Sequence, residues 1–178
     1  MKRRRYFQNN SMCILTLLFA LWASFVWGQS ATERTLSFYN THTQERLMVT
    51  YKKDDVYIPG AMNKISHILR DHRTGEIHQI DPQLMDFLYD LLTAVGNHSE
   101  VHIISGYRSP KTNHKLRGRS KGVAARSLHM KGKALDFRLP GTDTAALRDT
   151  ARAMKRGGVG YYRKLDFVQI DTGRVRYW

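Results

Sequence analysis

Near the beginning of the chain, after an initial apolar stretch, hydrophobic and polar residues alternate in two short segments. Residues 34–40 ("RTLSFYN") and 46–51 ("RLMVTY") show the two-residue period of strands that are buried on one face. The polar segment between them, "THTQE", is suited to a turn. The pattern therefore predicts a β-hairpin.

A helical period follows in two segments. Residues 59–73 carry apolar side chains at helical spacing. The clearest helix begins after Asp81, a good N-cap, and has Pro82 in its first position, where the missing N–H costs nothing. Gly96 and Asn97 end it. Its single apolar stripe is expected to be core and consists of Leu84, Phe87, Leu88, Leu91, Leu92 and Val95.

The second half of the chain alternates short strands with helical segments. Its predicted elements are a strand running into a loop at 100–109, a helical turn at 111–118, a basic loop at 119–127, a strand at 133–139, a helix at 142–157 capped by Thr142 or Thr144, and strands at 157–162, 166–171 and 174–178. Strands at both ends with helices between them indicate an α+β fold. We expect a single compact domain with an antiparallel sheet and flanking helices.

The first 28 residues are typical of an export signal. Four basic residues at positions 2–5 precede an apolar run from Met12 to Trp27. The run is long for a signal peptide and short for a membrane span, so both a cleaved signal and an uncleaved inner-membrane anchor remain open; the segment lengths favour removal after Gly28. The paired arginines leave both the Sec and the Tat route open. The domain then comprises residues 29–178.

The composition limits which catalytic groups and which binding partners are expected. The only cysteine, Cys13, lies in the apolar run, so the exported part has neither a disulfide nor a thiol nucleophile. The net charge is +14, and without the leader it is +10, with 25 Lys and Arg against 15 Asp and Glu. Such an excess indicates a polyanionic partner or a solvated basic surface. Export argues against nucleic acid as the partner and favours carboxylate-rich cell-wall peptides or anionic lipid headgroups. Membrane attachment is expected only through an uncleaved leader. The sequence indicates no oligomeric state.

A histidine and an aspartate are the first candidates for a functional site. In "SLHMKGKALDF", His129 lies just before a predicted strand and Asp136 within it. Alternation turns the apolar neighbours of Asp136 toward the core and Asp136 toward the opposite, open face. Gly132 permits a sharp return between the two residues. A histidine nitrogen and a carboxylate oxygen brought together in this way can bind zinc.

The strand at 166–171 follows the same alternation. Val168 and Ile170 face the core, so Gln169 faces the open side. If this strand neighbours the one at 133–139, Gln169 points into the same volume as Asp136. Asp166, at the start of the strand, would reach over that volume from the adjoining loop.

Four segments together resemble a known family. "SGYRSPKTN", "GVAARSLHMKGKALDFRLPG", "GGVGYY" and "FVQIDTGRVRYW" are similar to the murein endopeptidase K group, exported zinc peptidases related to the LAS-type D-alanyl-D-alanine carboxypeptidases and dipeptidases. The likeness extends from about "TLSFYNTHT" to Trp178. It implies a Hedgehog/DD-peptidase-like fold, a Zn²⁺ cofactor and peptidoglycan stem peptides as substrate.

The resemblance also implies roles for individual residues. His129 and Asp136 match the first two zinc ligands. Arg108, in "SGYRS", matches the arginine that stabilises the substrate carbonyl as it becomes an oxyanion. Asp166 matches the acid that takes a proton from the zinc-bound water and passes it to the leaving amine. Ser127 matches a serine of the motif with a supporting, substrate-binding role.

One position departs from the family pattern. The third zinc ligand of these enzymes is a histidine, whereas this chain has Gln169, whose neutral amide oxygen is a poorer zinc donor. Two functions are therefore expected. The first is a zinc-dependent murein endopeptidase of the periplasm that hydrolyses peptide cross-links through a metal-activated water. The alternative is a catalytically impaired, non-enzymatic peptidoglycan-binding protein.

Overall fold

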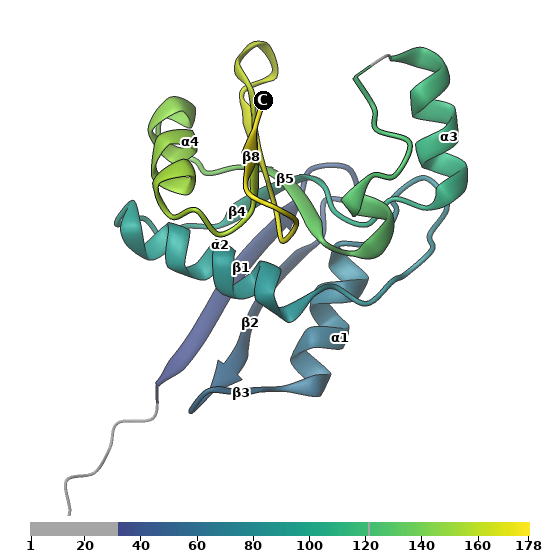
Figure 1. Cartoon of the computed structure of the whole chain (residues 1–178). Helices are drawn as coiled ribbons and strands as arrows, with labels where there is room; N and C mark the ends of the chain where they lie inside the picture. Colours follow the sequence, from purple (N-terminus) through teal and green to yellow (C-terminus); the bar gives the residue numbers. More distant parts are fainter. Residues whose placement is uncertain (1–31, 121) are drawn as a thin grey trace, which may run out of the picture. The chain divides into compact units, whose positions relative to one another are not determined.

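The predicted hairpin opens the described part of the chain. The computed structural model describes residues 32–120 and 122–178, so the expected export signal lies outside the described residues. Strands β1 (Glu33–Asn40) and β2 (Arg46–Lys53) pair antiparallel, as the alternation predicted (Figure 1). The hairpin is thus confirmed.

The hairpin forms one end of an eight-stranded sheet with the order β3-β2-β1-β4-β5-β7-β6-β8. The α+β prediction is confirmed, and most neighbouring strands are antiparallel. Two pairs, β1 with β4 and β6 with β8, are parallel, because the chain crosses over before it returns to the sheet. The remaining strands are β3 (Val56–Tyr57), β4 (Val101–Ser105), β5 (Ala134–Arg138), β6 (Gly158–Tyr162), β7 (Phe167–Asp171) and β8 (Arg176–Tyr177).

The helices are α1 (Pro59–Ile68), α2 (Pro82–Ala94), α3 (Pro110–Arg119) and α4 (Thr144–Ala153). Helix α3 is longer than the single turn predicted. Helix α4 corrects the expected cap: Asp143, and neither neighbouring threonine, accepts the Ala146 N–H at 2.9 Å. Within the described residues, no helix has the length and apolar character needed to cross a bilayer.

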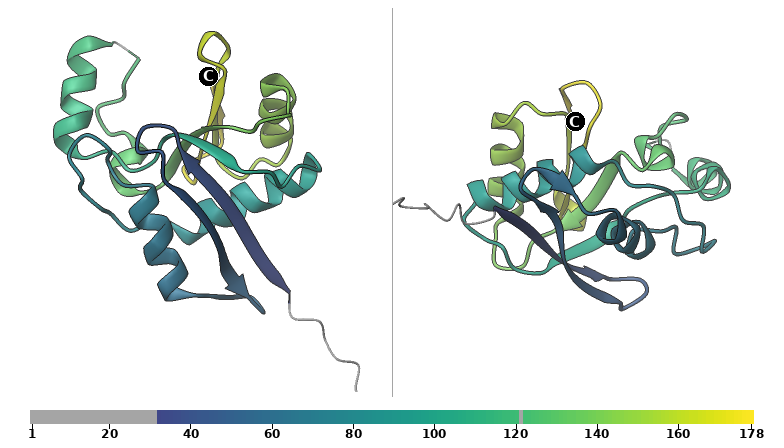
Figure 2. Two further views of the ribbon diagram at one scale, coloured as in Figure 1. Left: turned by 180° about the vertical axis from the view of Figure 1, so that it is seen from behind. Right: turned by 90° about the horizontal axis from the view of Figure 1, so that it is seen from below.

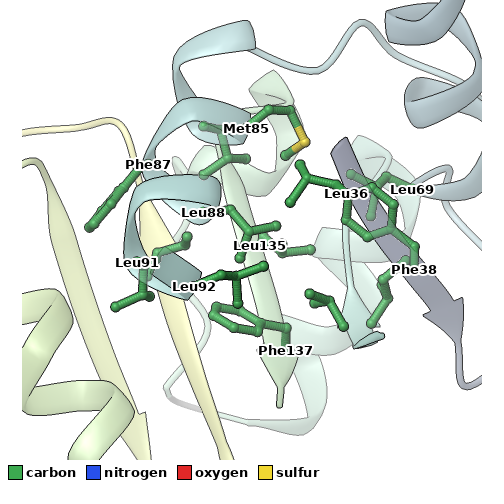
Figure 3. Close-up of a cluster of buried hydrophobic side chains, with 14 of the residues drawn as sticks. Leu36, Phe38, Leu69, Met85, Phe87, Leu88, Leu91, Leu92, Leu135 and Phe137 are labelled. Atoms are coloured by element: carbon green, nitrogen blue, oxygen red, sulfur yellow. The ribbon is translucent and has the colours of Figure 1, made fainter. Parts of the chain in front are cut away.

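Helices α1 and α2 cover one face of the hairpin end of the sheet. In the rear view of Figure 2, β1 and β2 lie in front of both helices. The predicted stripe of α2 is buried, with Val95 only partly so, and packs on side chains of β1 and β5 (Figure 3). Asp81 caps this helix by accepting the Gln83 N–H at 3.0 Å, as expected. The core therefore lies under α1, α2 and α4, which leaves the opposite face of β5 and β7 free of the core.

Truncating the α2 stripe should destabilise the protein. Leu88 is fully buried, so Leu88→Ala should lower the free energy of unfolding by about 2–5 kcal/mol, because it removes buried methyl groups and leaves a cavity. Urea unfolding followed by circular dichroism measures the change. Met48→Ala, at a position that is 75% exposed, is the control and should change it by no more than about 0.5 kcal/mol.

Candidate functional site

Strand register places two predicted site residues side by side. Strands β5 and β7 are antiparallel neighbours, and Asp136 pairs directly with Gln169. The alternate residues Leu135 and Phe137 are fully buried in the core, so Asp136 lies on the open face, as the alternation predicted. The prediction that Asp136 and Gln169 share one volume is thus confirmed.

A tight turn adds His129 to this pair. His129 lies in the short 3-10 helix η1 (Leu128–Lys131), and the chain then reverses at Gly132 with φ of 63°. A Cβ at Gly132 would lie 2.2 Å from the backbone oxygen of Gln79, so both the conformation and the close approach require glycine. The imidazole of His129, only 2% exposed, is thereby held against the start of β5.

The hydrogen bond of His129 Nδ1 determines what its other nitrogen can do. Nδ1 lies 2.7 Å from the carbonyl oxygen of Gly106, which can only accept, so Nδ1 carries the proton. In the neutral ring, Nε2 therefore presents a lone pair. That lone pair faces two oxygens, Asp136 Oδ1 at 3.3 Å and Gln169 Oε1 at 3.4 Å. A metal ion that accepts all three atoms as ligands would make this arrangement favourable.

These three donor atoms fit a metal ion. In a tetrahedral zinc site with bonds of about 2.0–2.1 Å, neighbouring ligand atoms lie about 3.3–3.4 Å apart, and both separations from Nε2 match this spacing. Asp136 Oδ1 is also buried without a hydrogen-bond partner. The described residues contain no group of three His, Cys, Asp or Glu side chains able to hold a metal, because the third donor here is the amide of Gln169.

An ion pair between buried Asp171 and partly exposed Arg176 lies next to Gln169. The amide nitrogen of Gln169 is 3.4 Å from Asp171 Oδ2, which leaves the amide oxygen facing His129. Asp171 is fully buried and accepts two hydrogen bonds from Arg176, at 3.0 and 2.6 Å. The orientation of the amide is therefore supported by a strong, bidentate pair.

Arg108 borders the three donors. Its Nη2 lies 3.6 Å from Asp136 Oδ2 and donates to Ser105 Oγ at 3.3 Å. Burial lowers the pKa of Arg108, whereas the Asp136 carboxylate acts in the opposite direction. The buried Nε of Arg108 has no hydrogen-bond partner. This guanidinium therefore lies beside the three donor atoms, and its Nε can still donate a hydrogen bond.

The donors lie in a cleft of about 680 Å³. One wall comes from α3 and the segment after it, and the other from the C-terminal strands; these two parts project in the same direction in Figure 1. Ser127 lines the cleft just before η1. The lining set also includes His42, Arg73, Ser105, Arg126, Tyr162, Leu165, Phe167, Arg176 and Trp178.

Asp166 is not among the residues that line the cleft. It has a left-handed backbone, with φ of 52°, between the short helix η2 (Arg163–Leu165) and β7. Its carboxylate is hydrogen-bonded to the hydroxyl of Thr144, at the start of α4. The structure therefore brings together Arg108, Ser127, His129, Asp136 and Gln169 and leaves Asp166 outside this group.

Known proteins resemble most of this chain in sequence. The family model described as peptidoglycan L,D-endopeptidase MepK, a peptidase of the M15 type, matches residues 28–178. The chain belongs to this family. It is 44% identical over 145 residues to peptidoglycan L,D-endopeptidase MepK of Escherichia coli (strain K12), which covers 82% of this chain and 80% of that protein. It is 40% identical over 146 residues to the probable enzyme of Haemophilus influenzae, covering 82% and 78%. No solved structure matches the chain.

Within this MepK-family chain, sequence reasoning missed several cleft residues. His42 lies in the predicted hairpin turn and Arg73 in the turn after α1, and neither segment showed a recognisable metal-binding or catalytic spacing. Trp178 reaches the cleft because it lies flat on Gly160, where a Cβ would approach its ring to 2.6 Å. Its indole N–H donates to the Tyr162 hydroxyl at 3.1 Å. The close approach of Gly160 is visible only once β6 and the C-terminal segment are folded together.

A second buried carboxylate fixes the cleft rim that carries Arg108. Asp71, 1% exposed, accepts the backbone N–H groups of Arg73 and Ser109, each at 2.9 Å. Burial acts in the opposite direction, but hydrogen bonds from Thr112 and Ser109 lower the pKa of Asp71 to about 2. The carboxylate therefore ties the turn after α1 to the start of α3.

Stability should depend on pH through Asp71. Its folded pKa of about 2 lies below the ordinary 3.8, so the stabilisation is complete above 3.8 and is lost as the pH falls toward 2. Asp71→Asn should therefore be less stable than the wild type at neutral pH, with the difference shrinking in acid. Urea unfolding from about pH 6 down to about pH 3 measures it. Asp55→Asn, where the side chain is 90% exposed, should show no such convergence.

Proposed function

We propose that this protein is a zinc-dependent endopeptidase that hydrolyses peptide cross-links of peptidoglycan. The observation that carries the proposal is the convergence of His129 Nε2, Asp136 Oδ1 and Gln169 Oε1 at the base of a cleft. Its relatives in Escherichia coli and Haemophilus influenzae are named as peptidoglycan L,D-endopeptidases, which supports the same substrate. The expected export signal and this substrate together support an activity in the periplasm.

The donors at the base of the cleft would hold the metal. When bound, zinc supplies a Lewis acid and a water molecule of lowered pKa. Gly106 holds the His129 ring through Nδ1, and Asp171 keeps the Gln169 amide oxygen directed toward His129. Such supporting contacts orient metal ligands and are characteristic of functional metal sites.

Arg108 would stabilise the negative charge that develops during the reaction. Its guanidinium is buried next to the donors, has an unpartnered Nε and is 3.6 Å from the Asp136 carboxylate. A fixed cation of this kind stabilises an oxyanion at little reorganisation cost, because it is already oriented in the unbound protein. Ser127, buried at the cleft wall, would contact the bound peptide.

A second function is favoured by the amide at position 169. An amide oxygen is a weaker zinc donor than an imidazole nitrogen, so the same cleft would bind wall peptides without cleaving them if zinc does not remain bound. Incubating the purified protein with cross-linked muropeptide dimers, with added zinc or with a chelator, distinguishes the two. Zinc-dependent release of monomers supports the peptidase; peptide binding without turnover under both conditions supports the binding protein.

Replacing Gln169 by histidine should tighten zinc binding. The imidazole offers a better donor, and its second ring nitrogen can donate to Asp171, the arrangement that metal-binding histidines usually adopt. Competition with a chromophoric chelator measures the affinity, and muropeptide release should rise with zinc occupancy. Gln169→Leu, which removes the donor, is the matched control and should bind zinc less tightly than the wild type. Equal affinities for the wild type and Gln169→Leu would show that Gln169 is not a ligand.

Asp166→Asn tests whether Asp166 transfers the proton during the reaction. Loss of a general acid or base costs about 10²–10⁴-fold in rate, which is the outcome that the family resemblance implies for this residue. The contact between Asp166 and Thr144, outside the cleft lining, favours a loss below about tenfold. Measuring kcat on muropeptide dimers decides between the two, with Thr144→Val as the control for loss of the same hydrogen bond.

A further inference from the structure

The cleft carries more positive than negative charge. Its lining includes Arg73, Arg108, Arg126 and Arg176, and among the described residues Asp136 is the only aspartate or glutamate that lines it. Arg176 is neutralised by Asp171 behind the cleft. In the described part of the chain, no ion pair joins Arg73 or Arg126 to a carboxylate, and both side chains are exposed. The cleft is therefore suited to an anionic group of the ligand.

Arg73 and Arg108 are held on the same rim. Asp71 accepts the backbone N–H of Arg73 through one carboxylate oxygen and that of Ser109, the residue after Arg108, through the other. The turn carrying Arg73 is closed by a hydrogen bond from Gly75 N–H to the Asp71 carbonyl at 2.8 Å. One buried carboxylate thus fixes the backbone positions of both arginines, although its own charge is directed into the loops and not into the cleft.

Arg73 lies near further titratable groups of this rim. Burial lowers the pKa of Arg108, the Asp136 and Asp71 carboxylates act in the opposite direction, and the like charge of Arg73 adds to the lowering. Burial, together with nearby His42 and Arg73, lowers the pKa of His72 to about 4. The rings of His42 and His72 stack with their centroids 3.8 Å apart. The stacked rings of His42 and His72 therefore lie near Arg73, which forms no ion pair in the described part of the chain, and near Arg108, whose charge is offset by Asp136 at 3.6 Å.

We propose that Arg73, on the rim next to Arg108, forms a subsite for a free carboxylate of the substrate peptide. This inference rests on the proposed function and adds to it a substrate feature. A guanidinium binds a carboxylate through two parallel N–H···O bonds, so the subsite selects the group by shape as well as by charge. Arg73 anchors the carboxylate, which leaves Arg108 free to act on the peptide bond next to it. Peptides in which this carboxylate is amidated lose the charge and one acceptor.

Two substrates and three variants test the subsite. The probes are one muropeptide dimer with free carboxylates and the same dimer with those carboxylates converted to amides. For the wild type, amidation should lower kcat/KM by about 10- to 100-fold, the range expected for a charge-assisted pair. Arg73→Gln should lower kcat/KM for the free dimer by a similar factor and leave the amidated dimer nearly unchanged. Arg73→Lys keeps the charge but cannot form the two parallel hydrogen bonds of a guanidinium. It should retain part of the preference for the free dimer.

Arg119→Gln is the matched control. It removes the same charge from the end of α3, outside the cleft lining, so it should leave the ratio between the two substrates unchanged. An equal loss for both substrates in Arg73→Gln would overturn the subsite, as would an equal change of the ratio in Arg119→Gln.

Binding measured without turnover separates this inference from the proposed activity. Calorimetric titration of the metal-free protein with the two dimers reports on the carboxylate alone. Preference for the free dimer that disappears in Arg73→Gln supports the subsite even if no cleavage is seen. Zinc-dependent cleavage without any preference between the dimers would support the peptidase activity and overturn the subsite.

Discussion

The pairing register of β5 and β7 is the constraint on which the site depends. It sets Asp136 directly opposite Gln169 on the face of the sheet that the core leaves free. Because side chains alternate along a strand, a slip of β5 by one residue would turn Asp136 into the core, away from Gln169, and expose Phe137 in its place. The buried apolar residues of these strands thus hold the polar pair in register. The Gly132 turn then needs only to bring His129 to the edge of this pair.

Two buried carboxylates support the cleft from opposite sides. Asp71 fixes the rim that carries Arg73 and Arg108, and Asp171 supports Gln169 and anchors Arg176. Neither one lines the cleft. Each is satisfied by several hydrogen bonds, which offset the cost of burying its charge. Negative groups behind the walls therefore hold the cleft-lining segments in place, while the lining itself carries more arginines than carboxylates.

The choice between the peptidase and the binding protein depends on the amide at position 169. The same hydrogen bonds that orient a metal ligand also orient a neutral polar group in an unoccupied groove, so the surrounding scaffold is compatible with both. What differs is the donor strength of a single atom. Family membership and the converging lone pairs favour the proposed peptidase, and the chemistry of that one oxygen would decide how firmly the proposed metal is held.

Local sequence patterns determined much of the secondary structure and part of the candidate site. Alternation in β5 and β7, the Asp81 cap and the α2 stripe follow from side-chain chemistry over a few residues, and they were enough to predict the α+β class and the Asp136–Gln169 pair. The same local pattern indicated His129, and the family resemblance added Arg108 and Ser127. Only the tertiary structure decided that β1 and β4 run parallel, that Asp166 contacts Thr144, and that His42, Arg73 and Trp178 line the cleft. These features depend on contacts between residues far apart in the chain, and no local period records which distant segments will meet.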